Sequence, residues 1–208
     1  ALLLLGNVRQ ASGKTDLARS NYQEILSSFG TTAAAIGARF HLGRLLVSSG
    51  RLKEGTDLLR KAAAQEQADS LLLRDALLEL GDALTTLGDA SGALAAYDRF
   101  LTLSGPSGAT SVVWRISRTA AIGKNYRRSN DAAMKLLQSE SPDSLKRRAL
   151  VRLALNAEAQ GEMRKAVDLF VQFTERYPAD PFTPAILARA AGRAQAGAGD
   201  PRTAIALN

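Results

Sequence analysis

Apolar and small residues recur along the chain with a period of about 38 residues. Each unit begins with a leucine and a small residue, and a glycine follows seven residues later. A second small residue comes five positions after that glycine, and a tyrosine, leucine or phenylalanine comes four positions further on. Four units follow this order, beginning at Leu5-Gly6, Leu42-Gly43, Leu80-Gly81 and Leu153-Ala154. Repeats of this period predict a solenoid, in which each unit buries its apolar face against its neighbours.

Each unit is predicted to contain two helices joined by a tight turn. In the third unit, leucines at helical spacing predict a first helix over 71–87. Gly88 ends this helix, because glycine readily takes the left-handed conformation found at helix C-termini. Asp89 is the predicted N-cap of a second helix over 90–103. The same punctuation in the other units predicts about eleven helices and no sheet.

The small residues have a steric role in this interpretation. Gly81 and Ala93 fall where the two helices of the third unit are expected to come closest. A large side chain at either position would push the helices apart and overpack the contact. Both residues are therefore predicted to be closely packed.

The fifth unit resembles the tetratricopeptide repeat, and the other units share parts of the same pattern. The resemblance is carried by Leu153, Ala154, Gly161, Ala166, Phe170, Phe173 and Pro178. It implies an all-α fold, a right-handed superhelical solenoid of antiparallel helix pairs with about five and a half repeats. The repeats are predicted to span 1–208 as a single solenoid domain. Because the chain begins and ends within a repeat, we interpret it as a fragment of a longer protein.

The fourth unit departs from the pattern. Ile122-Gly123 and Tyr126 fit its beginning, but no glycine turn follows them. The polar segment 128–131 predicts an early turn, which leaves a short second helix over 132–138. The register of this unit stays open at this point.

The full chain has a net charge of +7, and its positive charge is concentrated in one part of the sequence. Residues 1–108 contain 11 basic and 11 acidic side chains, whereas residues 109–176 contain 13 basic and 7 acidic ones. A concentrated basic region attracts acidic proteins, nucleic acid or anionic surfaces.

The resemblance implies that certain positions on the first helix of each unit face a concave groove. In this register the groove positions are neutral in the first unit, acidic in the third, and basic in the fourth and fifth. The predicted partner-binding residues are Lys124, Arg127, Arg148, Arg152, Arg44 and His41. Trp114 lies off the repeat pattern, and we interpret it either as a cover for a helix seam or as a partner contact.

No residue is predicted to catalyse a reaction or to hold a cofactor or a metal. The chain has no cysteine, and its single histidine, His41, lacks the aligned partners that a metal site or a catalytic triad needs. The segment 12–15 resembles the end of a phosphate-binding loop, but Val8 stands where that motif needs its first glycine. No apolar run approaches the ~20 residues of a membrane span.

The pattern favours a protein-interaction scaffold that binds an extended or helical segment of a protein or peptide, preferably an acidic one, in its groove. One alternative is an RNA- or polyanion-binding repeat, since 50–54 faintly resembles the pentatricopeptide repeat; the acidic groove positions of the third unit argue against nucleic acid. Another is a non-catalytic helical arm of a larger enzyme. The segment 177–181 is similar to linkers of bacterial cell-envelope members of the family, which favours a periplasmic location. The oligomeric state is left open.

Overall fold

The computed structural model describes residues 1–65, 70–105 and 110–197 of the chain, with side chains described as far as residue 195. The chain forms two compact units, Ala1–Ala109 and Thr110–Asn208, and each is described by itself. That the repeats continue as one solenoid domain over 1–208 stays a prediction.

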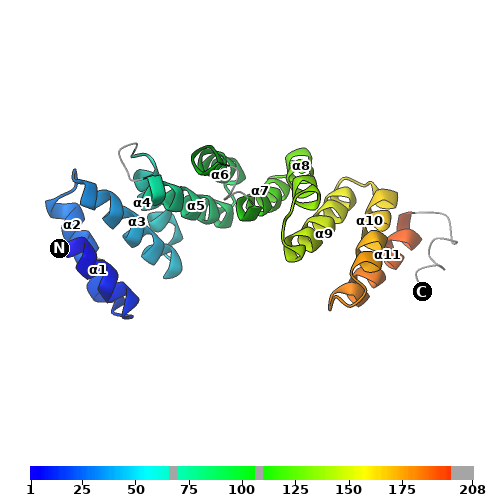
Figure 1. Ribbon diagram of the computed structural model, residues 1–208, viewed down its shortest axis with the longest axis horizontal. Helices are drawn as coiled ribbons and strands as arrows, with labels where there is room; N and C mark the ends of the chain where they lie inside the picture. The colour runs from blue at the N-terminus through cyan, green and yellow to red at the C-terminus, as the bar shows by residue number, and fades with distance from the viewer. Residues whose placement is uncertain (66–69, 106–109, 198–208) are drawn as a thin grey trace. The chain divides into compact units, whose positions relative to one another are not determined.

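The N-terminal unit consists of three consecutive helix pairs (Figure 1). Each helix packs on the next one along the chain, and the first helices of neighbouring pairs also contact each other. The pairs are α1 (Leu2–Ala11) with α2 (Thr15–Ser28), α3 (Ala33–Ser48) with α4 (Leu52–Ala63), and α5 (Ser70–Leu87) with α6 (Ala90–Ser104). The observed bounds of α5 and α6 confirm the two helices predicted for the third repeat to within one residue.

The C-terminal unit continues the same alternation. It contains α7 (Thr110–Ile122) with α8 (Tyr126–Gln138), α9 (Asp143–Ala159) with α10 (Met163–Arg176), and then α11 (Thr183–Gly197). Successive helices pack together, and the first helices α7 and α9 also contact each other. Over the described ranges the chain has eleven helices and no strand, which confirms the predicted all-α fold of antiparallel helix pairs.

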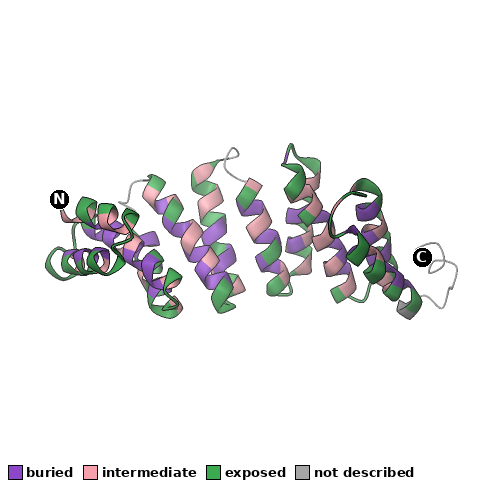
Figure 2. Cartoon of the chain, turned by 90° about the horizontal axis from the view of Figure 1, so that it is seen from below, coloured by how far each residue is buried: buried purple, intermediate pink, exposed green. Residues whose placement is uncertain are grey.

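Large rings on the second helices pack against small residues on the first helices. Tyr22, Tyr97 and Phe170 stand at the ring position of their repeats and are at most 1% exposed. A Cβ atom added to Gly81 would lie 2.7 Å from Cδ1 of Tyr97, so only glycine fits there. Ala93 on α6 is also completely buried, as predicted. Buried positions accordingly form stripes between the helices (Figure 2).

A glycine in the left-handed conformation ends the first helix of four pairs, as predicted. Gly13, Gly50, Gly88 and Gly161 all have positive φ angles, between 73° and 86°. At the start of α6 the carboxylate of Asp89 accepts a hydrogen bond of 2.9 Å from the backbone N–H of Gly92. This confirms the predicted N-cap, which satisfies one of the free N–H groups of the first helical turn.

The fourth repeat has the same architecture with different residues. α8 is 13 residues long and begins at Tyr126, so the predicted turn at 128–131 and the short helix over 132–138 are wrong. Lys124 takes the place of the turn glycine, with a φ angle of 58°. The left-handed position was hidden in the sequence because glycine, and not lysine, usually occupies it.

The corrected register moves the small residues of this repeat. Counting back seven positions from Lys124 puts Ile116-Ser117 at the leucine-small position, so the prediction of Ile122-Gly123 for this position is wrong. Counting forward five positions gives Ser129 as the second small residue. Both serines are completely buried, as their counterparts Gly81 and Ala93 are closely packed in the third repeat.

A buried polar network joins the three helices α7, α8 and α9. The Ser117 hydroxyl donates to the Ser129 carbonyl oxygen (2.9 Å), and the Ser129 hydroxyl donates to the Ser117 carbonyl oxygen (2.7 Å). From α9 the amide of Asn156 donates to Ser129 Oγ and to Asn130 Oδ1, each at 2.7 Å. Asn156 is only 1% exposed. The network satisfies polar groups that would otherwise be costly to bury.

Replacing Lys124 with glycine is expected to raise the free energy of unfolding by about 1 kcal/mol, because a left-handed conformation strains any residue with a Cβ by roughly 1–2 kcal/mol. Thermal and urea unfolding of the variant would measure this gain. The reverse change, Gly88→Lys, serves as the matched control and is expected to destabilise by a similar amount. A Lys124→Gly variant less stable than the wild type would contradict the assigned turn.

Candidate partner-binding site

The six predicted partner-binding residues fall into three places. His41 and Arg44 lie on α3 in the N-terminal unit, and Arg148 and Arg152 lie on α9 in the C-terminal unit. Lys124 lies in the turn between α7 and α8, and Arg127 lies in the first turn of α8. Placing these last two on the groove-facing first helix of repeat four was therefore wrong, because that helix ends at Ile122.

The corrected register names two other residues for the groove face of α7. Arg115 and Arg118 hold the positions relative to Ser117 that His41 and Arg44 hold relative to Gly43. The basic character predicted for this repeat is thus retained with different side chains. Spacing could have found them, since the two small residues of every repeat are separated by 12 positions, including Ser117 and Ser129.

In the N-terminal unit the cations on α3 are already engaged. Nε of Arg44 forms an ion pair of 3.1 Å with Glu79 on α5, and its guanidinium lies over the Phe40 ring. His41 stacks on Tyr22 with ring centroids 5.6 Å apart. Burial, and then the charge of Arg44, lower the pKa of His41 below its ordinary value, so this imidazole is neutral at pH 7. These two residues of α3 therefore offer little uncompensated positive charge.

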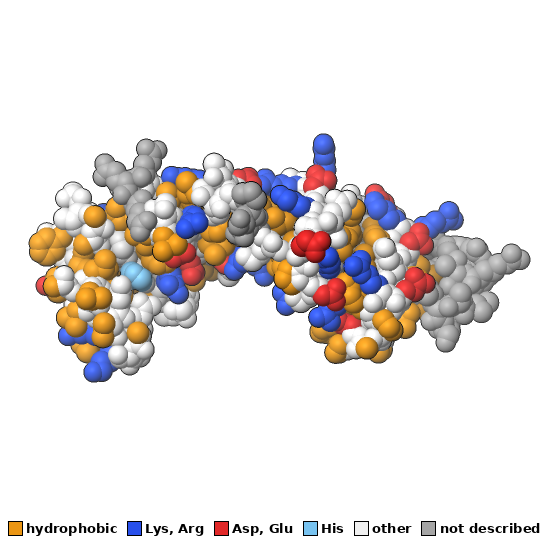
Figure 3. All heavy atoms as spheres, in the orientation of Figure 1, with side chains coloured by type: hydrophobic (Ala, Val, Ile, Leu, Met, Phe, Trp, Pro, Cys, Tyr) orange, Lys and Arg blue, Asp and Glu red, His pale blue; other side chains and the backbone are white. Residues whose placement is uncertain are grey.

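The C-terminal unit contains a groove of about 620 Å³ between its first helices. α7, α9 and α11 all contribute side chains to it, and α10 contributes the buried rings of Phe170 and Phe173. The face drawn in Figure 3 shows apolar and basic side chains side by side over this unit, with acidic ones nearby. The groove thus combines an apolar floor with arginine side chains.

Arg152 is the most unusual side chain of this groove. Its guanidinium lies over the ring of Trp114, 5.9 Å from the ring centroid. Its Nε is buried and has no hydrogen-bond partner in the part of the chain that the structure describes. Burial, and secondly the charge of Arg118, lower the pKa of Arg152, although an arginine remains protonated at neutral pH.

Glu158 of α9 pairs with two arginines of α11, of which Arg189 lines the groove. Arg189 forms two hydrogen bonds with Glu158, of 2.8 and 3.1 Å, and Arg193 pairs with the same carboxylate. Burial acts to raise the pKa of Glu158, but the bonds and charges of these two arginines outweigh it and hold the pKa below its ordinary value. Arg148, which is exposed, and Arg152 make no ion pair with any described residue.

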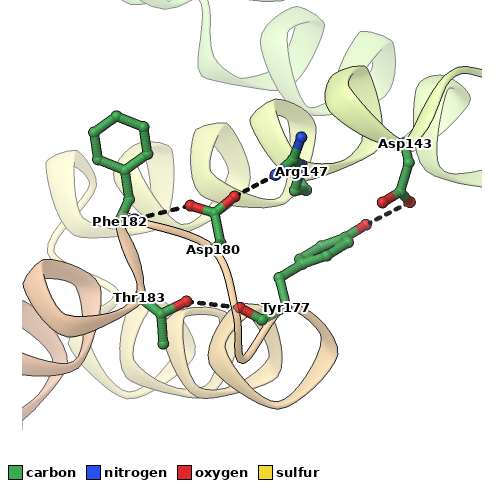
Figure 4. A network of polar contacts seen from close by, with 6 residues as sticks. All are labelled: Asp143, Arg147, Tyr177, Asp180, Phe182 and Thr183. Carbon is green, nitrogen blue, oxygen red and sulfur yellow. Dashed lines mark hydrogen bonds and ion pairs between the residues drawn. The ribbon is translucent and has the colours of Figure 1, made fainter.

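A second acidic residue organises the rim of the groove (Figure 4). Asp180 pairs with Arg147 on α9 and accepts a 2.9 Å hydrogen bond from the backbone N–H of Phe182. Next to it the Thr183 hydroxyl donates to the carbonyl oxygen of Tyr177, at 2.7 Å. These contacts hold the segment before α11 so that Phe182 lines the groove while 70% of its surface stays exposed.

Sequence reasoning did not select Phe182, and it left Trp114 open between two roles. The structure places Trp114 in the groove wall beneath Arg152, and it places Phe182 at the rim. Neither follows the repeat pattern, because each depends on where the segments between repeats lead the chain. The sequence signal that could have identified them is an aromatic residue next to a segment between repeats and outside the repeat pattern.

The described residues contain no group of three or more His, Cys, Asp or Glu side chains arranged to hold a metal ion. Among the helices of the described ranges, none combines the length and the apolarity needed to cross a membrane.

The paired helices, the small residues between them and the left-handed turns define a helical-repeat protein. Models of the tetratricopeptide repeat match residues 3–70, 75–104 and 148–180, which together make up more than half of the chain. The chain belongs to the tetratricopeptide repeat family. This membership supports a general role as a protein–protein interaction scaffold, and the family's fold is generally that of non-catalytic scaffolds. No curated protein sequence matches the chain.

Solved structures of the same family share the fold. YrrB, described as a TPR protein with an unusual peptide-binding site, has a TM-score of 0.71 and 16% identity over 88% of this chain and 89% of its own. MamA has a TM-score of 0.67 and 18% identity over 85% and 90%. PilF of Pseudomonas aeruginosa has a TM-score of 0.61 and 18% identity over 90% and 80%. At these identities the likeness concerns the fold.

Proposed function

We propose that this chain is a binding scaffold for an acidic segment of a partner protein, held in an extended or helical form along the groove of its C-terminal unit. The supporting observation is the pair Arg148 and Arg152, which have no acidic partner among the described residues and line a groove with an apolar floor. An acidic segment supplies the missing counter-charge, and its apolar side chains cover the floor.

The remaining predicted residues have smaller roles in this proposal. Lys124 and Arg127 are exposed, outside the set of groove-lining residues, and act through long-range attraction. Arg44 and His41 belong to the other unit, where Arg44 is neutralised by Glu79. We therefore expect changes at Arg148 and Arg152 to affect binding more than changes at the other four.

Selection of peptides from a displayed random library on the purified chain tests the proposal. Enriched peptides should carry net negative charge, and their binding should weaken as salt rises, since the Debye length falls from ~10 Å at 0.1 M to ~3 Å at 1 M. Arg148→Glu/Arg152→Glu should lower their affinity at least about tenfold, or about 1.4 kcal/mol.

Lys135→Glu/Arg164→Glu is the matched control, because it makes the same change in net charge at exposed positions of α8 and α10 outside the groove. This variant should bind the enriched peptides with nearly wild-type affinity. Equal losses in the two variants would attribute binding to net charge alone and would reject the groove. Tighter binding of single-stranded polyuridylate than of any selected peptide would instead favour the nucleic-acid alternative.

A further inference from the structure

We infer, building on the proposed function, that the groove of the C-terminal unit recognises a defined pair of partner side chains. One is a carboxylate that binds Arg152, and the other is a bulky apolar side chain that packs between Phe182 and the groove floor. The partner chemistry is thus an acidic residue and a large apolar one, two positions apart in an extended segment.

The carboxylate position rests on Nε of Arg152, which is buried and has no hydrogen-bond partner among the described residues. A buried donor without a partner is energetically costly, and Arg118 adds repulsion from a like charge. A guanidinium matches a carboxylate through two parallel hydrogen bonds. In the bound state the guanidinium rotates over the Trp114 ring. Its Nε and one terminal nitrogen then each donate a hydrogen bond to the partner carboxylate.

The indole of Trp114 strengthens the attraction of an anion to Arg152. The indole covers one face of the guanidinium, which excludes water from that side and lowers the local dielectric constant. An ion pair formed there is stronger than one in open solvent. Arg148, one helical turn before Arg152 on α9, adds a second positive charge at the same face of the helix.

The apolar position rests on Phe182 and its fixed backbone. A phenylalanine that is 70% exposed is unfavourable on a folded surface, yet the Asp180 side chain and Arg147 hold its segment in place. The half-buried Leu155 of α9 also lines the groove. A partner side chain between these two residues removes apolar surface of both from water, which favours binding.

The spacing of the two positions sets the spacing in the partner. Arg152 and Leu155 are three residues apart on α9, which places their Cβ atoms about 5–6 Å apart on one face. In an extended segment, residues two positions apart point to the same side at roughly 6.6 Å. Because three successive first helices line the groove, the segment can continue on both sides. We therefore assign the carboxylate to a side chain and not to a chain terminus.

The test uses the full 208-residue chain and dye-labelled decapeptides with blocked ends, in which Glu-Ala-Phe is embedded in a glycine-serine background. Fluorescence anisotropy reports binding anywhere on the protein. Emission of Trp114, the only tryptophan, reports occupation of the groove itself. Matched peptides carry Gln-Ala-Phe, Glu-Ala-Ser, or a free C-terminal carboxylate without the glutamate.

We expect the Glu-Ala-Phe peptide to change Trp114 emission and to bind at least about tenfold tighter than the Gln-Ala-Phe peptide. In Arg152→Gln this preference should disappear, while the affinity for the Gln-Ala-Phe peptide stays unchanged. Phe182→Ser, at an exposed position, should remove the preference for Phe over Ser and keep the preference for Glu over Gln. Arg164→Gln is the control and should alter neither preference.

Three outcomes would overturn the inference. Peptide binding by anisotropy without a change in Trp114 emission, or with equal affinity for the Glu and Gln peptides, rejects this site and leaves the scaffold function standing. Equally tight binding of the peptide with only a free C-terminal carboxylate rejects the assignment to a side chain. Absence of binding by any acidic peptide rejects the inference and the proposed function together.

Discussion

Replacing Gly81 with leucine is expected to destabilise the N-terminal unit by about 3 kcal/mol, the upper part of the usual range for overpacking. The side chain would enter the space filled by the Tyr97 ring, which is completely buried. That ring cannot easily move aside, because the Tyr97 hydroxyl donates a 2.7 Å hydrogen bond to Asp82. Hydrogen exchange in peptides from α5 and α6, together with the thermal midpoint, would measure the loss.

Gly192→Leu provides the matched control for this change. Gly192 also lies within a helix, but a Cβ atom added there meets no atom within 4 Å beyond its chain neighbours and the backbone of its own helix. Leucine favours the helix over glycine by up to about 1 kcal/mol, so the control should be neutral or slightly stabilising. If Gly81→Leu were as stable as the wild type, the close packing of α5 on α6 would be refuted.

Replacing Asn156 with leucine is expected to destabilise the C-terminal unit by about 2–3 kcal/mol. Leucine has a similar size, so the loss comes from the two hydrogen bonds that Asn156 donates to Ser129 and Asn130. Two acceptors then lose their donor, and that of Ser129 is completely buried. Urea unfolding followed by far-ultraviolet circular dichroism would measure the change.

A double-mutant cycle separates this network from simple packing. Ser129→Ala removes the buried acceptor, so Asn156→Leu made in that background should cost less than it does in the wild type. Additive losses in the double variant would mean that the hydrogen bond between the two side chains contributes nothing to stability. The cycle thus reports on the network that joins α7, α8 and α9.

This network occupies the region where the repeat pattern is weakest. In the first and third repeats a tyrosine ring packs on glycine, whereas the fourth repeat has Ala133 at the ring position and Ser117 at the glycine position. The second helix therefore has a smaller residue at the ring position (Ala133), and the first helix has a larger residue at the glycine position (Ser117). The hydrogen-bonded serines then connect the helices that the ring and glycine connect elsewhere.

The two units differ in whether their groove-facing arginines are neutralised by acidic neighbours, although both units contain basic residues. Arg44 is neutralised by Glu79, which lies 35 positions later on the equivalent helix of the next repeat. Arg152 at the equivalent face of α9 has no such neighbour among the described residues. Counting charges along the chain located the basic region, but only the packing of neighbouring helices decided which cations remain available.

The sequence by itself determined the helix pairs, their turns and the packed faces of four repeats. These features depend on local rules, since glycine at Gly88 and the small residue at Gly81 are required by backbone conformation and by contact within one pair. The local rules did not reveal the fourth repeat. In this repeat Lys124 takes the left-handed turn position with some strain, and the two serines join the helices through hydrogen bonds. Its register therefore became visible only with the tertiary structure.

Most of the groove lining was decided by the tertiary structure. Its lining comes from α7, α9, α10 and α11, so it depends on contacts between residues far apart in the sequence. The register implied by the family resemblance predicted Arg148 and Arg152 as groove residues, and both line the groove. The aromatic wall at Trp114 and the rim at Phe182 depend on segments between repeats, which the periodic pattern does not describe. Local periodicity specifies each helix pair, whereas the side chains that a partner meets are set by how successive pairs stack.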